Sequence, residues 1–217
     1  MISVLNRIRM PQKPFSWKKL LCGAGLSLIL GFALGVFSKY LDYRQAVLPY
    51  FFRCLDEALD FHNFLGGFMP WLFAGVCLSL YAAAPVYAAA NVFVFFAGMV
   101  SGYYLYCNFF AGFFPLSYAM IWVGFTLLSP ILAAVLWYAS GKGTLAAFLR
   151  AGVLAVFFNL TFFYGMWYFD LRSWLHLAFF AAVVVIFRRT FRETALTLLC
   201  GVGIAVVLNA FLPRIFY

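Results

Sequence analysis

The chain has 217 residues, of which 67% are hydrophobic and only 10% are charged, and its mean hydropathy is +1.00. Soluble domains average about 45–50% apolar and about 25% charged residues, so a soluble fold of this length could not bury so much apolar surface. The net charge of +9 comes from basic residues beside the apolar runs, where they act as topology signals, and we expect no nucleic-acid binding.

The apolar runs predict an all-α protein, a bundle of about seven transmembrane helices, with six as the alternative. Residues 1–19 form a basic segment that we expect in the cytoplasm, and residues 20–212 a single transmembrane domain. Pro85 supplies the break that separates the second span from the third. The predicted spans cover residues 20–37, 68–82, 89–107, 116–138, 146–167, 173–187 and 194–212.

The first span carries a ridge of small residues, each four positions after the last: Gly23, Ser27, Gly31 and Gly35. This spacing places them on one helix face, and small residues let another transmembrane helix approach closely. The ridge predicts either packing within this bundle or docking of a partner subunit in the membrane. Gly98 and Gly102 repeat the spacing once in the third span.

An amphipathic helix is predicted over residues 49–62, which follow the first span. Pro49 suits the first position of a helix. Phe52, Leu55 and Leu59 share one face, and charged residues occupy the other. The segment is predicted to lie in the outer interface, or to act as a lid over an outward cavity.

Polar and aromatic residues gather at the outer ends of the predicted spans. This mixture is typical of small-ligand sites, although aromatic belts occur at every membrane interface, and Asp42 or Asp170 could instead pair internally with the nearby cations. The candidate ligand-binding residues are Lys39, Asp42, Arg44, Tyr103, Tyr106, Asn108, Tyr118, Trp122, Asn159, Trp167, Asp170, Arg172 and His176.

A few polar groups fall within the predicted spans. Asn159 is expected to hydrogen-bond a neighbouring helix or to line a pathway. Pro130 leaves a carbonyl one turn earlier without its N–H partner, and a nearby hydroxyl such as Ser129 can satisfy that carbonyl. The segment 140–144 looks suited to phosphate, but it lacks the P-loop spacing, and we interpret it as a turn.

The basic residues predict the orientation. With the N-terminus inside, seven spans place ten lysines and arginines in the cytoplasm and five outside, which favours an inside N-terminus and an outside C-terminus. The sequence contains no nucleophile–base signature and no metal-ligand spacing. We therefore expect no enzyme activity, no catalytic residues, no metal and no cofactor.

Several stretches together resemble a family of small, uncharacterised bacterial polytopic membrane proteins. The resemblance implies a bacterial cytoplasmic (inner) membrane and carries no activity. The stretches are GFALGVFSKYLD (31–42), NVFVFFAGMVSGYYLYCNFF (91–110), GFFPLSY (112–118), LSPILAAVLWYASGKG (128–143) and YFDLR (168–172).

The chain also resembles the substrate-binding S subunits of energy-coupling-factor transporters, small hydrophobic proteins of about six helices. The ridge matches the motif with which those subunits meet a membrane coupling subunit, and the outer aromatic cluster matches the position of their ligand site. The resemblance implies partner-driven uptake through the first span.

The leading prediction is a membrane protein that binds or transports a small molecule captured at the outer face, and whose ligand the sequence leaves unknown. A non-transport assembly factor, sensor or regulator that binds another membrane protein is the main alternative. An intramembrane enzyme is the third. In every case the lipid bilayer is the surrounding medium.

Overall fold

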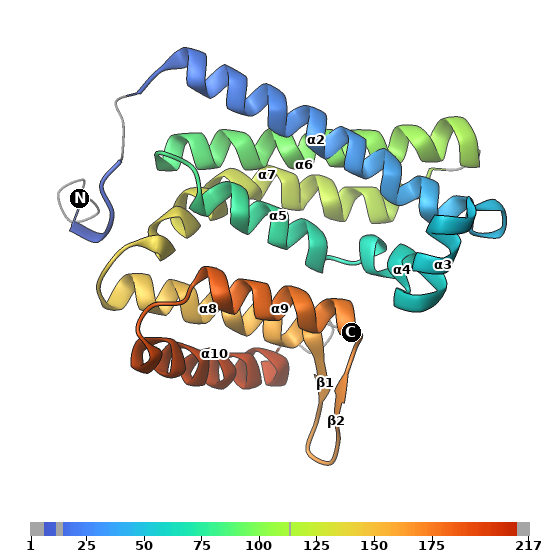
Figure 1. Ribbon diagram of the computed structural model, residues 1–217. Coiled ribbons are helices and arrows are strands. Elements are labelled where there is room, and N and C mark those ends of the chain that lie inside the picture. The colour runs from blue at the N-terminus through green and yellow to red at the C-terminus, as the bar shows by residue number, and fades with distance from the viewer. Residues whose placement is uncertain (1–6, 12–14, 113, 212–217) are drawn as a thin grey trace. The chain divides into compact units, whose positions relative to one another are not determined.

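The computed structural model describes residues 7–11, 15–112 and 114–211, and most of these are helical (Figure 1). Five helices in this part of the chain are long and apolar enough to cross a membrane, which makes the chain a multi-pass membrane protein. They are α2 (Trp17–Tyr43), α6 (Pro85–Tyr106), α7 (Leu116–Trp137), α8 (Thr144–Thr161) and α10 (Phe191–Phe211).

Shorter elements connect these five helices. Two of them, α5 (Met69–Leu80) and α9 (Trp174–Ile186), are apolar helices that fall within the predicted second and sixth spans. Each predicted span thus contains a helix, and the prediction of a helical membrane protein is confirmed. The remaining elements are α3 (Tyr50–Leu59), α4 (Phe61–Gly66), single turns over Gln45–Val47, Cys107–Ala111 and Tyr138–Ser140, and the strands β1 (Phe162–Tyr164) and β2 (Phe169–Leu171).

The chain divides into two compact units, each of which is described by itself. Unit 1 comprises Met1–Arg9, Gly67–Phe73 and Tyr138–Tyr217, and unit 2 comprises Met10–Gly66 and Ala74–Trp137. The first residues of α5 therefore belong to unit 1 and its remainder to unit 2. The single domain over residues 20–212 stays a prediction.

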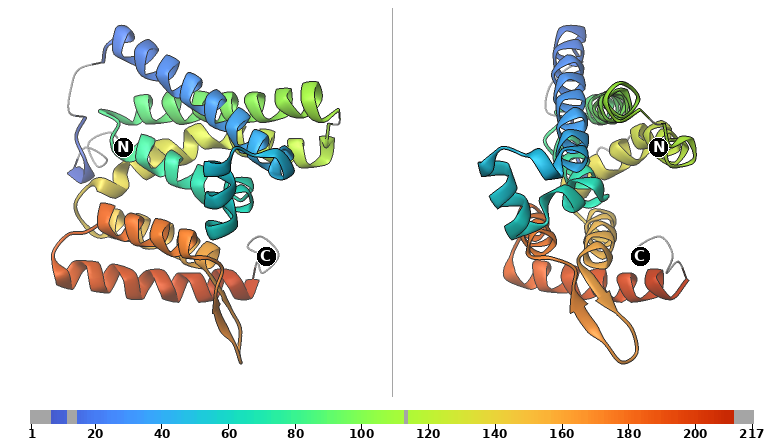
Figure 2. Two further views of the ribbon diagram at one scale, coloured as in Figure 1. Left: turned by 45° about the vertical axis from the view of Figure 1, so that its right-hand side comes forward. Right: turned by 90° about the vertical axis from the view of Figure 1, so that its right-hand side faces the viewer.

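In unit 2, α2 packs against α6 through glycines on both helices (Figures 1 and 2). A Cβ added at Gly31 would overlap the carbonyl oxygen of Phe95, and one added at Gly102 would overlap that of Phe32. Backbone therefore touches backbone, an approach that only small residues permit. Because positions 31 and 35 of α2 meet positions 95 and 99 of α6, the two helices run parallel.

Helix α7 continues through Pro130 without a break. Pro130 has no N–H, so the carbonyl of Thr126 loses its helical partner. The Ser129 hydroxyl donates to that carbonyl at 2.8 Å, as the sequence predicts. At the end of α7, the buried Trp137 indole donates to the carbonyl of Ala82 at 2.7 Å and ties α7 to the turn that follows α5.

The predicted amphipathic helix over 49–62 is two helices, α3 and α4. Asp60 separates them with φ 52°, a left-handed conformation that ends α3. Asp56 then joins the pair, because its carboxylate accepts the backbone N–H of His62 at 2.7 Å. Pro49 caps α3 from the position before its first residue, so its prediction as the first helical residue is wrong by one position.

In unit 1, α8 packs against α10. Gly201 of α10 lies against Ala151 of α8, and Asn159 of α8 donates to the carbonyl of Ala205 at 3.1 Å. The residue numbers of the contacting positions increase in the same direction on both helices, so α8 and α10 also run parallel. The predicted hydrogen bond from Asn159 to a neighbouring helix is confirmed.

The predicted fifth span, 146–167, is wrong at its end. Helix α8 stops at Thr161, and β1 pairs with β2 in an antiparallel hairpin, with Phe162 opposite Leu171 (Figure 2). Hydropathy does not distinguish the two structures here, because the hairpin is as aromatic as the helix before it. Aromatic residues favour strands, and Gly165 suits the turn, where its N–H donates to Tyr168.

Candidate functional site

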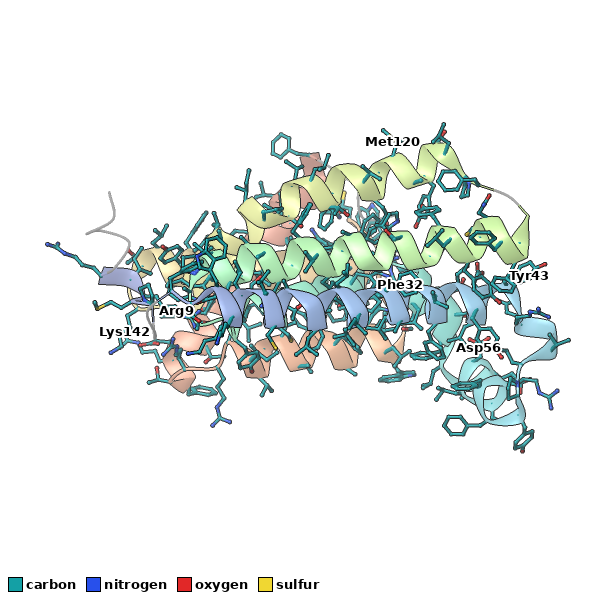
Figure 3. All side chains as sticks on the ribbon, turned by 90° about the horizontal axis from the view of Figure 1, so that it is seen from above. Arg9, Phe32, Tyr43, Asp56, Met120 and Lys142 are labelled. Atoms are coloured by element: carbon teal, nitrogen blue, oxygen red, sulfur yellow. The ribbon has the colours of Figure 1, made fainter. Side chains whose placement is uncertain are left out.

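The loop between α7 and α8 holds one side of the candidate site, and two glycines determine its path. A Cβ at Gly141 would overlap the carbonyl oxygen of Ile8, and Gly143 has φ 91°, which only glycine adopts readily. The Lys142 N–H donates to the same Ile8 carbonyl at 2.9 Å. Lys142 and Arg9 thus lie at the same end of unit 1 (Figure 3).

The other side of the site is the start of α10. The Thr190 hydroxyl accepts the Glu193 N–H at 3.3 Å, a side-chain cap at the helix N-terminus. The Thr194 hydroxyl accepts the N–H of Arg189 at 3.1 Å. Because α8 and α10 run parallel, their N-termini, the positive ends of their dipoles, lie at the same end of unit 1.

Two arginines hold the loop between α7 and α8, and one of them, Arg189, connects the two sides. Arg150, only 5% exposed, donates through Nη1 to the carbonyl oxygens of Ala139 at 2.9 Å and Gly141 at 3.2 Å. Arg189 reaches the same loop from the segment just before α10 and donates to the carbonyl oxygens of Ser140 and Gly141. These bonds satisfy carbonyl groups of the loop between α7 and α8, a structural role that uses some of the N–H donors of each guanidinium.

Another N–H donor of Arg150 takes no part in these bonds. A guanidinium has five N–H donors, and the Arg150 Nε is buried without a hydrogen-bond partner among the described residues. A buried donor that stays unsatisfied costs about 1–3 kcal/mol. An anion that accepts from this group would remove the cost.

A cavity of about 730 Å³ lies between the two sides, and we call it the basic pocket. Its volume is within the range of small-molecule sites, about 300–1,000 Å³. Lys142, Arg150 and Arg189 face Glu193 alone, and none of the ion pairs in the described part of the chain neutralises these cations. It is lined by residues 141–144, Ala147 and Arg150, and by Arg189, Thr190, Glu193, Leu196 and Thr197.

Sequence reasoning did not find this pocket. The interpretation of 140–143 as a turn is confirmed, but its lysine shares a cavity with Arg150 and Arg189. The available signal was the presence of basic residues at both predicted inner loops. Their convergence depends on how α8 packs against α10, which no local pattern encodes.

Part of the predicted outer site comes together in unit 2. Lys39 is 6% exposed, donates to the Asp42 carboxylate and lies 5.4 Å from the centre of the Tyr103 ring. The internal pairing that the sequence allows for Asp42 is therefore confirmed. The buried Tyr104 hydroxyl has no hydrogen-bond partner among the described residues.

The other predicted residues of unit 2 differ in burial and in their neighbours. Tyr106 packs against Tyr40, Tyr43 and Phe110, and its ring centre lies 4.7 Å from that of Phe110. Trp122 is buried. Arg44, Asn108 and Tyr118 are exposed, and the Arg44 guanidinium lies 5.8 Å from the Tyr43 ring.

The predicted residues of unit 1 fall into two environments. Asn159 and His176 are buried, and Asn159 accepts from the Tyr164 hydroxyl at 2.6 Å. Arg172 stacks over the Phe163 ring at 4.2 Å, while Trp167 at the hairpin tip is 92% exposed and Asp170 is also exposed. These residues thus differ in burial, and capture at the outer face stays a prediction.

The ridge of the first span is occupied by α6. Gly31 and Gly35 meet Phe95 and Met99 of that helix, and Gly23 lies near the Asn91 side chain. Packing within the bundle, the first of the two predicted uses, is therefore confirmed. Docking of a coupling subunit would need another face of α2.

Comparisons of the chain with protein-family models, with curated proteins and with solved structures find no match.

Proposed function

We propose that this is a seven-span protein of a bacterial cytoplasmic membrane that binds a phosphate-bearing anion at its cytoplasmic side. The parallel helix pairs support seven spans, because a chain that crosses twice in one direction must return in between. Helix α5 supplies the return between α2 and α6, and α9 the return between α8 and α10. At about 1.5 Å per residue these short helices span only about 18–20 Å, which local thinning of the bilayer can accommodate.

The basic residues support an inside N-terminus and an outside C-terminus. Short cytoplasmic loops are enriched in lysine and arginine, and the proposed topology places ten of these residues inside and five outside. The basic pocket then opens in the cytoplasmic interface. The ten are Arg7, Arg9, Lys13, Lys18, Lys19, Lys142, Arg150, Arg188, Arg189 and Arg192.

The observation that carries anion binding is the buried Arg150 with its unpaired Nε beside a cavity that holds three cations and one carboxylate. Guanidinium groups match phosphate geometry, and the N-termini of two helices add N–H donors at the same end. Phosphate satisfies more of these donors than a carboxylate does, because it offers three or more acceptor oxygens. The sequence also predicts a small-molecule ligand, but at the outer face and with other residues.

Thermal unfolding of the purified protein in detergent, titrated with inorganic phosphate at constant ionic strength, tests the proposal. Phosphate should raise the Tm in a saturable way, because it binds the folded state only. Lys142→Gln should weaken the apparent affinity about fivefold, and Glu193→Gln should strengthen it by a similar factor, since each changes the pocket charge by one unit.

The two variants are informative because the Lys142 and Glu193 side chains make no hydrogen bond or ion pair among the described residues, so the fold should tolerate both changes. Arg53→Gln is the matched control, an exposed cation on α3 whose replacement changes the net charge equally. Equal phosphate affinity in all four proteins, or no phosphate effect on the wild type, would contradict the proposal.

A further inference from the structure

An apolar groove of about 470 Å³ runs along the membrane-spanning part of unit 1. Phe148 lines it from α8, and α10 contributes Cys200, Gly203, Ile204, Val207 and Leu208. A Cβ at Gly203 would meet nothing within 4 Å, so the glycine leaves the groove open. Exposed apolar surface alone is ordinary for a span, and its position relative to the basic pocket is what distinguishes this groove.

The groove continues from the basic pocket along one face of α10. Leu196 and Thr197 line the pocket, and Cys200 lines the groove one turn later. Residues three and four apart share a helix face. On α8, Ala147 of the pocket directly precedes Phe148 of the groove. Along α10 the residues of the charged end and of the apolar end therefore share one helix face.

The length of the site matches one leaflet of a bilayer. From Leu196 to Leu208 the helix rises about 18 Å at about 1.5 Å per residue. Half of the hydrocarbon core is about 15 Å. The site therefore offers an acyl chain apolar surface at least as long as one leaflet is deep.

We infer that the ligand of the basic pocket is a membrane lipid with an anionic phosphate headgroup, held by Lys142, Arg150 and Arg189, with one acyl chain along the apolar groove. This rests on the proposed function and names the class of its ligand. A water-soluble phosphate would use the pocket alone and leave the groove to unselected lipid. Basic pockets between transmembrane helices on the cytoplasmic side suit anionic headgroups.

Native mass spectrometry of the detergent-purified protein tests the inference with two lipids that share their acyl chains, palmitoyl-oleoyl phosphatidic acid and palmitoyl-oleoyl phosphatidylcholine. We expect one molecule of the anionic lipid to bind about tenfold more tightly than the zwitterionic one. Lys142→Gln should reduce this preference about fivefold. Gly203→Leu should weaken the affinity for the anionic lipid about tenfold, because the leucine side chain would occupy the groove.

Gly124→Leu is the matched control, a glycine of α7 in unit 2 that also has open space around it. The decisive variant is Gly203→Leu, which should leave the Tm response to inorganic phosphate unchanged but weaken the affinity for the lipid. If phosphate binds but phosphatidic acid is no better than phosphatidylcholine, or Gly203→Leu has no effect, the lipid inference fails and anion binding stands. If phosphate does not bind and the anionic lipid is not preferred over the zwitterionic one, the proposed function fails as well.

Discussion

Single residues carry two different kinds of constraint in this protein. At Gly31 the constraint is steric, because the backbone of α6 occupies the place of any side chain. At Arg150 it is electrostatic, because a buried guanidinium holds carbonyl groups with one nitrogen and leaves another unpaired. The first stabilises a helix pair, and the second leaves a binding capacity that the fold itself does not use.

Gly31→Ala should lower the free energy of unfolding by about 1–3 kcal/mol, the usual cost of overpacking, since its methyl group would overlap the Phe95 carbonyl. Equilibrium unfolding in mixed detergent measures the change. Gly25→Ala is the control on the same helix, with nothing within 4 Å of the added carbon. It should be neutral or stabilising by up to about 1 kcal/mol, because alanine favours the helix. Equal stability of the two variants would contradict the packing described for α2 and α6.

At the scale of elements, a short polar junction holds two amphipathic helices together. The Asp56 carboxylate accepts from the N–H of His62, and the His62 ring nitrogen Nδ1 lies 2.9 Å from both of its oxygens. Tyr43 and Asp56 lie toward the same end of unit 2 (Figure 3). Ser38 of α2 donates to the carbonyl of Leu65, which attaches α4 to the first span.

Asp56→Ala should release α4 from α3 and speed amide hydrogen exchange over Phe61–Gly66 about five- to thirtyfold, which corresponds to about 1–2 kcal/mol. Hydrogen-exchange mass spectrometry in nanodiscs measures the rate. Glu57→Ala removes a neighbouring carboxylate whose pairing with Arg53, at 3.8 Å, is solvent-exposed. That variant should leave the exchange unchanged, because exposed ion pairs contribute little. Similar acceleration in both variants would assign the effect to charge alone.

At the scale of the whole molecule, the direction of each helix pair constrains the topology. Both pairs, α2 with α6 and α8 with α10, are parallel. Between the two helices of each pair, one helix must therefore bring the chain back across the membrane. The helices in these places are α5 and α9, although both are shorter than the bilayer core is thick. The proposed seven spans depend on these two short helices.

Labelling of single cysteines in intact cells with a membrane-impermeant maleimide checks the topology. With the other native cysteines replaced, Cys54 and Met166→Cys should react from outside, because the proposed topology places α3 and the hairpin tip there. Tyr81→Cys and Lys142→Cys should react only after the cells are permeabilised. Reaction of Tyr81→Cys in intact cells would mean that α5 does not cross, and the seven-span proposal would fall.

The sequence by itself determined the class of fold and most helix positions, because hydropathy and length decide what a bilayer accepts. It also predicted the hydroxyl that donates to the carbonyl left free by Pro130, and the interhelical hydrogen bond of Asn159. Each follows from one unpaired or buried polar group. Its error at the hairpin has the same source: hydropathy measures burial in lipid and does not distinguish a strand from a helix.

Only the tertiary structure decided which surfaces meet. The glycine ridge admits either an internal or an external partner, and the close approach of α6 selects the internal one. The basic pocket combines a loop before α8 with the start of α10, and these residues lie about fifty positions apart in the chain, so their contact is non-local. Side chains brought together by helix packing leave no periodic pattern in the sequence. The pocket depends on the parallel packing of α8 and α10, which only the tertiary structure shows.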